Sequence, residues 1–262
     1  MDGHSVEKAA SALLCAYFSR TPIPPLTDDY PDLSVADAYA IQVAQVAAWT
    51  SAGALVKGHK VGLTSAVMQR QLGVDQPDSG VLLDTMFLAE GAGAKFGRFL
   101  QPRVEPEIAF VLGRPLRGPG VTVAEALAAV DFVLPALEII DSRIADWQIT
   151  LADTVADNAS SGAVVLGSRP VRADSLDLSL VGCLLRRNGQ LEGTGAGGAV
   201  LGSPVNALVW LANTLGARGA GLEAGHVILP GSVCAAIALG AGDTVSATFD
   251  RLGSVSVTFS EK

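Results

Sequence analysis

Three glutamates in apolar stretches are the residues whose types and spacing best suit chemistry. Glu105 and Glu107 lie in the run Val104–Leu112, where side chains alternate across a strand, so an apolar set occupies one face and both carboxylates the other. Two carboxylates at that spacing repel each other unless a cation or a proton separates them. On their own, they indicate an exposed strand face with two solvated acids.

Glu138 changes this interpretation from solvated acids to a metal site. It lies inside the run Val133–Ile140, in which every neighbour is apolar, and a buried unpaired carboxylate is costly. A hard divalent ion with oxygen ligands, such as magnesium or manganese, would compensate all three acids. The sequence therefore predicts that Glu105, Glu107 and Glu138 bind a divalent cation.

The elements before about residue 78 are expected to be helical. Each expected helix begins after a serine that can cap it and ends at a glycine or a proline-rich stretch. The three helices run from Ser5 to the stretch Thr21–Pro25, from Ser34 (with Asp37 three residues on) to about Trp49 before Gly53, and from Thr64-Ser65 to Gly73.

After Asp78 the chain changes to short β-like runs separated by glycine and proline. The strand candidates are Val104–Leu112, Phe132–Ile140, Ala163–Leu166, Leu178–Arg186, and a closing hairpin of Val245–Phe249 and Val255–Phe259 around Arg251-Leu252-Gly253. Two helices interrupt them, one capped by Thr122 with Glu125 and one opened by Ser203-Pro204 and continuing through Leu215.

The order of these elements predicts an α+β fold. Strands do not alternate strictly with helices, so a doubly wound parallel sheet is not expected. A mixed β-roll with a smaller helical N-terminal part fits better, and we expect a division into a helical part, residues 1–78, and a β-roll catalytic domain, residues 79–262.

Composition and charge limit the classes of partner. Of 262 residues, 49% are hydrophobic and 17% charged, which disfavours disorder, and a net charge of -8 without a basic stripe disfavours nucleic acid. No apolar run reaches the ~20 residues that span a bilayer, and no export signal precedes the first helix, so neither a membrane nor secretion is expected. Three cysteines without metal-ligand spacing fit a reducing compartment, and we expect a cytoplasmic protein.

One glycine-rich motif is set aside. Gly193–Gly198 matches the letters of a dinucleotide-binding fingerprint, but four residues separate it from the helix that begins at Ser203-Pro204. We expect a flexible loop there. The histidines His59 and His226 show no ligand spacing, and His59 should point away from Lys60 across a strand.

Several segments together resemble the hydratase/decarboxylase family of the fumarylacetoacetate hydrolase superfamily. They are Lys60–Ser65, Gly73–Asp78, Gln101–Ile108, Ala136–Ile144, Asp153–Ser161 and Leu252–Ser256, in order from about Ser34 to Phe259. The resemblance implies a β-roll of the fumarylacetoacetate hydrolase C-terminal type, magnesium or manganese as cofactor, homo-oligomers, and the same three glutamates as metal ligands. Pro106 departs from the alanine common in relatives, and its missing N–H requires an edge position or a bulge.

The resemblance also suggests which polar side chains could act on a substrate. Lys60 is the first candidate, for proton transfer or for binding a substrate carboxylate, and burial beside a cation would lower its pKa. Asp78 is the second, and Asp157 with Ser160 could position water. Without the resemblance these residues would indicate a snorkelling lysine, a capping aspartate and ordinary turn chemistry.

The function that the resemblance implies is addition of water to 2-hydroxypenta-2,4-dienoate or a close analogue, giving a 4-hydroxy-2-oxo acid in the catabolism of aromatic compounds. The downstream aldolase is a candidate partner. The stretch Ser142–Trp147 resembles the hydratase branch, and Ser79 leaves the substrate tail open. Alternatives are a 4-oxalocrotonate-type decarboxylase, which needs extra cations such as Lys57, Arg103 or Arg143, and a non-catalytic partner in a catabolic complex. The stretch Asp157–Ser160 argues against a hydrolase of acylpyruvates.

Overall fold

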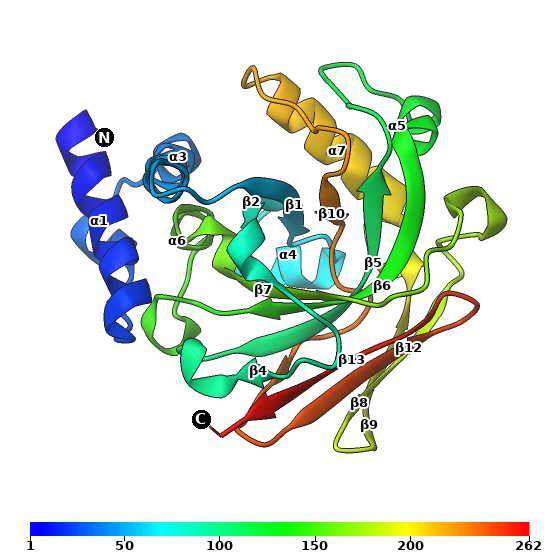
Figure 1. Cartoon of the computed structure of the whole chain (residues 1–262). Helices are drawn as coiled ribbons and strands as arrows, with labels where there is room; N and C mark the ends of the chain where they lie inside the picture. Colours follow the sequence, from blue (N-terminus) through cyan, green and yellow to red (C-terminus); the bar gives the residue numbers. More distant parts are fainter. Residues whose placement is uncertain (262) are drawn as a thin grey trace.

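Two β-sheets with helices at their periphery organise the protein, whose computed structural model describes residues 1–261 (Figure 1). The larger sheet has eight strands in the order β2-β1-β10-β5-β6-β7-β3, with β11 also paired to β5, and the smaller has five in the order β4-β13-β12-β8-β9. The strands are β1 (Val56–Gly62), β2 (Asp78–Leu83), β3 (Phe87–Leu88), β4 (Ala94–Lys95), β5 (Arg103–Leu112), β6 (Val130–Ile140), β7 (Ser161–Leu166), β8 (Gly182–Arg187), β9 (Gln190–Ala196), β10 (Val227–Leu229), β11 (Ile237–Ala238), β12 (Thr244–Phe249) and β13 (Gly253–Ser260).

Helices α1 and α3 lie on one side of the molecule and α5 and α7 on another, while the short α4 lies among the strands between them (Figure 1). The α-helices are α1 (Gly3–Ser19), α2 (Leu26–Asp29), α3 (Val35–Ser51), α4 (Ala66–Leu72), α5 (Val123–Ala129), α6 (Leu151–Ala156) and α7 (Pro204–Gly216), and the 3-10 turns are η1 (Asp84–Met86), η2 (Phe96–Arg98), η3 (Ala145–Trp147), η4 (Asn158–Ser160), η5 (Ala173–Ser175) and η6 (Gly197–Ala199). None of the helices in residues 1–261 is long and apolar enough to cross a membrane.

The main apolar core lies between the two sheets. The apolar face predicted for β5 is confirmed, because Val104, Ile108 and Phe110 are buried there with Phe249 of β12 and Phe259 of β13. Each strand that reaches this core therefore presents its other face to a different environment. On β5, that other face carries Glu105 and Glu107.

Helix capping follows the sequence closely. The capping boxes predicted from Ser34 with Asp37 and from Thr122 with Glu125 are both present. The short helix α4 begins after Ser65 and ends at Gly73 in the left-handed conformation, as expected. The expected cap of the first helix was wrong by three residues: Asp2 caps α1, because its carboxylate accepts the backbone N–H of Ser5.

The segment expected to be helical also contributes a strand to the sheet. β1 pairs with β2 and runs parallel to β10, so residues 1–78 are not helical throughout, and His59 and Lys60 lie on a strand as expected. Its sequence carries two glycines and no clean alternation, and close packing selects the strand: a Cβ at Gly58 would lie 1.8 Å from the carbonyl oxygen of Val227. The α+β class and the mixed sheets are confirmed; the division at residue 78 stays a prediction.

Two further expectations are corrected. Strand β8 begins at Gly182 and not at Leu178, and the glycine run that we expected to be a flexible loop is strand β9 followed by η6. A Cβ at Gly195 would lie 1.9 Å from the carbonyl oxygen of Val233, and one at Gly197 would lie 1.9 Å from that of Leu178. These glycines therefore serve close backbone packing.

Pro106 lies at a local edge within β5. Strand β10 pairs with Phe110–Val111 and β11 with Arg103–Val104, so neither short strand reaches Pro106. Its carbonyl accepts the N–H of Val233 from the segment that joins β10 to β11. Because N and O of one residue point to the same side of a strand, the missing N–H faces that segment and interrupts no pairing with β6.

Candidate active site

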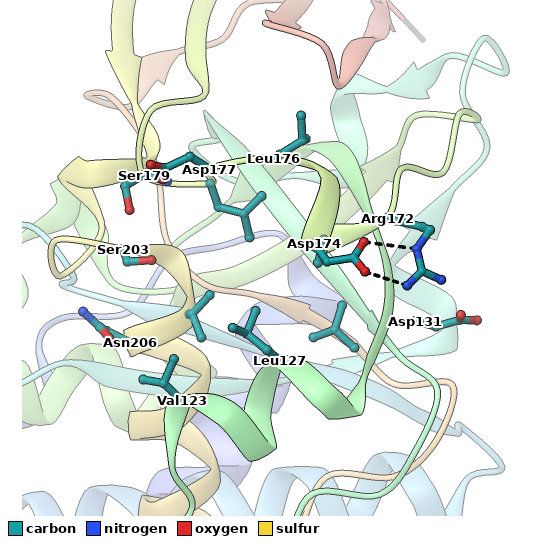
Figure 2. A pocket seen from close by; sticks show the side chains of 14 residues that line it. Val123, Leu127, Asp131, Arg172, Asp174, Leu176, Asp177, Ser179, Ser203 and Asn206 are labelled. Carbon is teal, nitrogen blue, oxygen red and sulfur yellow. Dashed lines mark hydrogen bonds and ion pairs between the residues drawn. The ribbon is translucent and has the colours of Figure 1, made fainter.

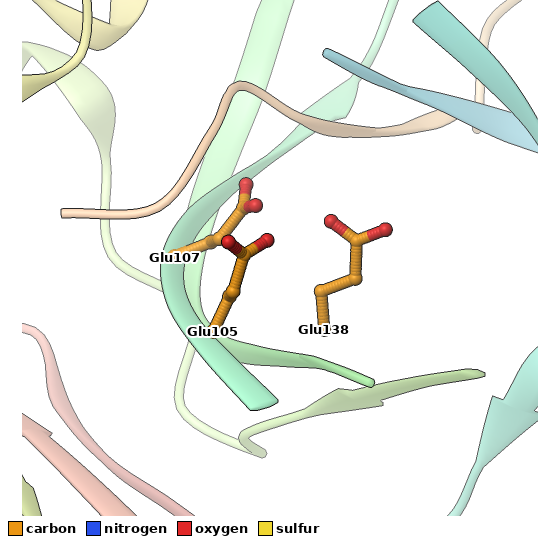
Figure 3. A group of neighbouring side chains, drawn as sticks. All are labelled: Glu105, Glu107 and Glu138. Atoms are coloured by element: carbon orange, nitrogen blue, oxygen red, sulfur yellow. The ribbon is translucent and has the colours of Figure 1, made fainter. Parts of the chain in front are cut away.

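The three glutamates predicted to bind a cation converge on one point. Glu105 of β5 stands directly opposite Glu138 of β6 in the antiparallel register, and Glu107 follows on the same face of β5. One carboxylate oxygen from each lies within 4.8 Å of the others. Figure 3 shows the three carboxylate groups turned toward one another. Strand pairing therefore brings together acids that are 33 residues apart in the chain.

Burial makes this cluster short of partners. Glu107 and Glu138 expose 0% and 1% of their surface. Within residues 1–261, Oε1 of Glu107 and both oxygens of Glu138 accept no hydrogen bond, while Oε2 of Glu107 accepts one from the N–H of Gly231 at 2.7 Å. Buried carboxylate oxygens without donors are costly. The donor set, all hard oxygens, fits a divalent cation.

The electrostatics of the cluster agree with that fit. Burial, followed by the charge of Glu138, raises the pKa of Glu105 to about 7. Burial also raises the pKa of Glu107 and of Glu138 above the usual range of a glutamate. The acids thus resist ionisation together, and a cation among them would remove that resistance.

Lys60 lies beside the glutamates, as the family resemblance implies. Its Nζ is 3.4 Å from Oε1 of Glu138 and donates to the carbonyl oxygen of Ala159 at 2.9 Å. The expectation that burial beside a bound cation lowers the pKa of Lys60 stays a prediction. Among the protein's own residues, burial alone would lower this pKa, but the carboxylates of Glu138 and Asp78 outweigh burial and raise it. Without a cation in the site, Lys60 is therefore an ammonium group.

Asp78 and Ser160 lie on the same side of the site, and Thr154 links them. The hydroxyl of Thr154 is 3.4 Å from Oδ2 of Asp78 and 3.5 Å from Oγ of Ser160. Oδ1 of Asp78 has no partner within residues 1–261, and burial raises the pKa of this carboxyl. A Cβ at Gly62 would lie 2.2 Å from that oxygen and 3.4 Å from Nζ of Lys60, so glycine leaves space for both side chains.

Asp157 is separated from this group by its own partner. Nε of Arg143 forms a 2.5 Å ion pair with Oδ1 of Asp157, and the N–H of Arg143 donates to Oδ2 at 3.0 Å. Both side chains are fully buried. Both carboxylate oxygens are thus occupied, so the geometry supports a bracing role for Asp157, and positioning of water by it stays a prediction without support.

A turn of left-handed residues connects this ion pair to Lys60. Asn158, Ala159 and Ser160 have φ of 51°, 50° and 53°, a conformation that is unfavourable for each non-glycine residue. The Asn158 side chain donates to the carbonyl of Val81 and accepts its N–H at 2.7 Å, as a neighbouring strand would. The turn thereby holds the Ala159 carbonyl against Lys60.

The other residues considered from the sequence fall on different sides of the site. Ser79 faces α3, where its Oγ is 3.3 Å from the hydroxyl of Tyr39, and it therefore leaves the substrate tail undetermined. His59 packs against His226, with ring centroids 5.8 Å apart, on the face of β1 opposite Lys60. Burial, with His226, lowers the pKa of His59 to about 3, so it is neutral.

Sequence reasoning missed Thr154, Gly231 and Asn158. Gly231 has a φ of 122°, and a Cβ there would lie 2.0 Å from Oγ1 of Thr64. The glycine-rich segment after β10 was visible in the sequence, but the partner of its N–H, Glu107, is 124 residues away. Long-range pairing of this kind leaves no local signal.

A cavity elsewhere on the molecule contains none of the predicted site residues. It has a volume of about 410 Å³ and lies between α5, the start of α7 and the segment 172–179 (Figure 2). Its wall combines exposed Val123 and Leu127 with the ion pair of Arg172 and Asp174. All the charges named there are paired or solvated, in contrast to those of the glutamate cluster.

Comparison with known proteins identifies the family to which this chain is similar. Residues 60–260 match the family described as fumarylacetoacetate (FAA) hydrolase C-terminal. The chain is 50% identical over 253 residues to 2-keto-4-pentenoate hydratase of Paraburkholderia xenovorans (strain LB400), covering 97% of this chain and 94% of that protein. It is 43% identical to 2-hydroxyhexa-2,4-dienoate hydratase of Comamonas testosteroni, covering 99% of each.

One solved structure has the same fold along almost the whole chain. 4-Oxalocrotonate decarboxylase from Pseudomonas putida G7, complexed with magnesium and adipate, superposes with a TM-score of 0.96 at 34% identity, covering 99% of this chain and 98% of that one. Its fold therefore includes the helical N-terminal part as well as the β-roll. The chain belongs to the fumarylacetoacetate hydrolase superfamily, in its hydratase/decarboxylase family.

Proposed function

We propose that the chain is a hydro-lyase that adds water to 2-hydroxypenta-2,4-dienoate, the enol form of 2-keto-4-pentenoate, or to a close analogue. Relatives at 40–50% identity that cover almost the whole chain are hydratases of such acids. The observation that carries the proposal is the cluster of Glu105, Glu107 and Glu138 beside Lys60. In it, Oε1 of Glu107 and both carboxylate oxygens of Glu138 are buried without a hydrogen-bond partner within residues 1–261.

These three glutamates would hold a divalent cation, and magnesium or manganese suits their oxygen ligands. The decarboxylase of the same fold was solved with magnesium, which supports magnesium first. When bound, the cation would supply a Lewis acid that stabilises negative charge on the 2-oxygen of the substrate. Homo-oligomers and association with a downstream aldolase remain part of the proposal.

The surrounding residues divide the remaining work. Lys60, an ammonium group with one N–H given to Ala159, has donors left for a substrate carboxylate. Asp78 has a raised pKa and a free oxygen, which suits a group that takes up and returns a proton. Thr154 connects Asp78 to Ser160 and so fixes the orientation of both.

The reaction needs two pairs of proton transfers and one new C–O bond. The dienol loses the proton of its 2-hydroxyl and gains one at C5, which gives a 2-oxo acid with a conjugated C3=C4 bond. The oxygen of water then bonds to C4 and releases a proton, and C3 receives a proton, so that one water is consumed. We assign proton transfer to Asp78, and we assign to Ser160 a hydrogen bond to the water. Arg143 and Asp157 keep the turn of Ser160 in place.

Removal of the cation tests this proposal most directly. We expect turnover of 2-hydroxypenta-2,4-dienoate to need added magnesium or manganese, and Glu107→Ala to abolish it while circular dichroism shows a folded protein. The matched control is Glu223→Ala, which removes a surface glutamate paired with Arg117. Undiminished turnover in the presence of a chelator, or in the Glu107→Ala variant, would contradict the proposal that catalysis needs a cation bound by these glutamates.

The second candidate is decarboxylation of a 4-oxalocrotonate-type diacid. The 0.96 TM-score to a decarboxylase supports it, whereas the closer sequence relatives are hydratases. Supplying 2-oxo-hex-3-enedioate and 2-hydroxypenta-2,4-dienoate in parallel separates the two, because only decarboxylation releases carbon dioxide. Release of carbon dioxide with no hydration would replace the first proposal by the second.

A further inference from the structure

A cation that forms no ion pair within residues 1–261 lies on the strand face that carries the proposed metal-binding glutamates. Arg103 is two residues before Glu105 in β5, and the pairing of β5 with β6 is regular from Arg103 to Val111. Side chains at positions 103, 105 and 107 therefore point to the same face. Arg103 is half-buried, and no carboxylate in residues 1–261 lies within 4.0 Å of its guanidinium.

The guanidinium is held by an aromatic ring instead. Its Cζ lies 4.4 Å from the centroid of the Trp147 ring, a cation–π contact. The indole is itself fixed, because its Nε1 donates to the carbonyl of Gln101 at 3.1 Å. Both Asp146 and Trp147 have left-handed backbone, with φ of 56° and 57°. Strain of this kind persists only where surrounding contacts impose it.

The loop that presents the ring is tied to β5 by several hydrogen bonds. The carboxylate of Asp141 accepts the N–H groups of Leu100 and Gln101, and the Gln101 side chain donates to the carbonyls of Ser142 and Ile144. Arg103 and Trp147 therefore stand on one rigid unit. A guanidinium that is already ordered loses little entropy when it binds a carboxylate through its planar fork.

The other cations near the site already have partners. Arg143 is fully buried and paired with Asp157, and Lys60 contacts Glu138 and Ala159, although it keeps a donor for a substrate carboxylate. Lys57 lies toward His226, whose pKa it helps to lower after burial has done so, on the side away from Lys60. Of the three candidate cations for a second substrate carboxylate, Lys57, Arg103 and Arg143, Arg103 is the one on the face of the glutamates whose charged group forms no ion pair within residues 1–261.

We propose that Arg103, ordered by Trp147, is a substrate-binding residue that takes a carboxylate of the organic acid through its guanidinium. The inference rests on the proposed function, and it names the group that this residue recognises. That carboxylate is either the one next to the reacting 2-oxo group or a second one at the far end of a longer acid. The two sources give different patterns of binding.

The test compares two acids of equal length in magnesium-loaded protein. Adipate has a carboxylate at each end and hexanoate has one, and binding of each is measured by calorimetry for the wild type, Arg103→Met and Arg103→Lys. We expect Arg103→Met to weaken adipate at least ~10-fold, with Arg103→Lys intermediate because a point charge replaces the fork. Trp147→Leu should weaken it less, since the guanidinium stays but loses its platform.

The pattern identifies the source of the carboxylate. Equal weakening of both acids assigns Arg103 to the carboxylate near the cation, and weakening of adipate alone assigns it to the far one. Unchanged binding of both acids in a folded Arg103→Met protein overturns the inference. Arg172→Met, which removes a surface arginine paired with Asp174, is the matched control. Thermal unfolding checks each variant, and Arg103→Lys keeps the test valid if Arg103→Met does not fold.

Hydratase turnover separates this inference from the function on which it rests. If the wild type hydrates 2-hydroxypenta-2,4-dienoate, both stand when calorimetry and kinetics agree. Arg103→Met should raise KM for this monoacid about 10-fold or more, with a smaller change in kcat, where both acids are weakened, and should leave KM unchanged where adipate alone is weakened. If the wild type does not hydrate that acid but the calorimetric pattern holds, the binding role stands and the proposed reaction fails.

Discussion

Two buried groups of charges differ in how their charges balance. Glu105, Glu107, Glu138 and Asp78 surround one ammonium group, and several of their oxygens have no donor within residues 1–261. Arg143 and Asp157 are equally buried, yet every carboxylate oxygen there has a donor. Buried carboxylates without donors indicate a binding site for a cation or another ligand, whereas a buried ion pair with all its hydrogen bonds made indicates a structural role.

Replacing a carboxylate by its amide should therefore change the stability of the protein in opposite directions in the two regions. The largest expected effect of such a replacement is on activity. Glu138→Gln removes one repelling charge but also one proposed ligand. We expect turnover to fall by about 10³-fold or more, since loss of Lewis-acid stabilisation costs ~4 kcal/mol in the transition state. Steady-state kinetics with added magnesium measure it; turnover within a factor of ten of the wild type would contradict the metal site.

In chelator, the Glu138→Gln protein should also unfold at a temperature equal to or above that of the wild type. The reason is that an amide needs no counter-charge in a buried site. Differential scanning calorimetry with and without magnesium checks this. The gain in unfolding temperature on adding magnesium, clear for the wild type, should shrink in the variant.

Asp157→Asn should lower the stability of the protein, in contrast to Glu138→Gln. It leaves the guanidinium of Arg143 buried without its counter-charge, and breaking such a pair costs about 3–5 kcal/mol of unfolding free energy. Urea unfolding measures the loss, and Asp174→Asn, on an exposed pair, should change it by less than ~1 kcal/mol. A stability loss no greater than that control would mean that the buried pair does not brace the turn.

The pH dependence of the metal-free protein sharpens the comparison further. The pKa of Glu105 is about 7 in the folded protein against 4.5 ordinarily, so the folded state keeps a proton that the unfolded chain releases between those values. Stability should therefore be highest below pH 4.5 for this group and should fall as pH rises toward 7. Unfolding temperatures in chelator from pH 5 to 8 test the slope, and magnesium should flatten it.

The sequence predicted the parts of this arrangement that depend on local pattern. Alternation in β5 put Glu105 and Glu107 on one face, and the apolar run around Glu138 indicated a buried acid. The register that sets Glu105 opposite Glu138 depends on how β5 and β6 pair, and nothing in either segment alone fixes it. Convergence was therefore a hypothesis until the structure placed the strands.

The features that sequence reasoning missed depend on distant neighbours. The carboxylates that raise the pKa of Lys60 in the absence of a cation come from other strands, so the sequence around Lys60 did not reveal them. Asp157 looked like turn chemistry, and its partner Arg143 is 14 residues away. The glycines of β9 looked like a loop because the backbone that packs on Gly195 belongs to another segment. The sequence shows the type of each side chain, but it does not show which distant residues surround that side chain in the fold.

The smallest expected effect is at Thr154, which lies between the two regions. Thr154 lies in α6, which ends just before Asp157 of the Arg143–Asp157 pair. Its hydroxyl contacts Asp78, which lies beside the glutamates, and Ser160. Thr154→Val keeps the shape and removes the hydroxyl, which should cost about 1 kcal/mol or less of stability. We expect kcat to fall several-fold, with KM unchanged, because Asp78 loses an orienting donor while the metal ligands stay. Ser175→Ala, at an exposed turn, is the control. An unaltered kcat would place Asp78 outside the proton-transfer step, and a KM effect alone would assign it to binding.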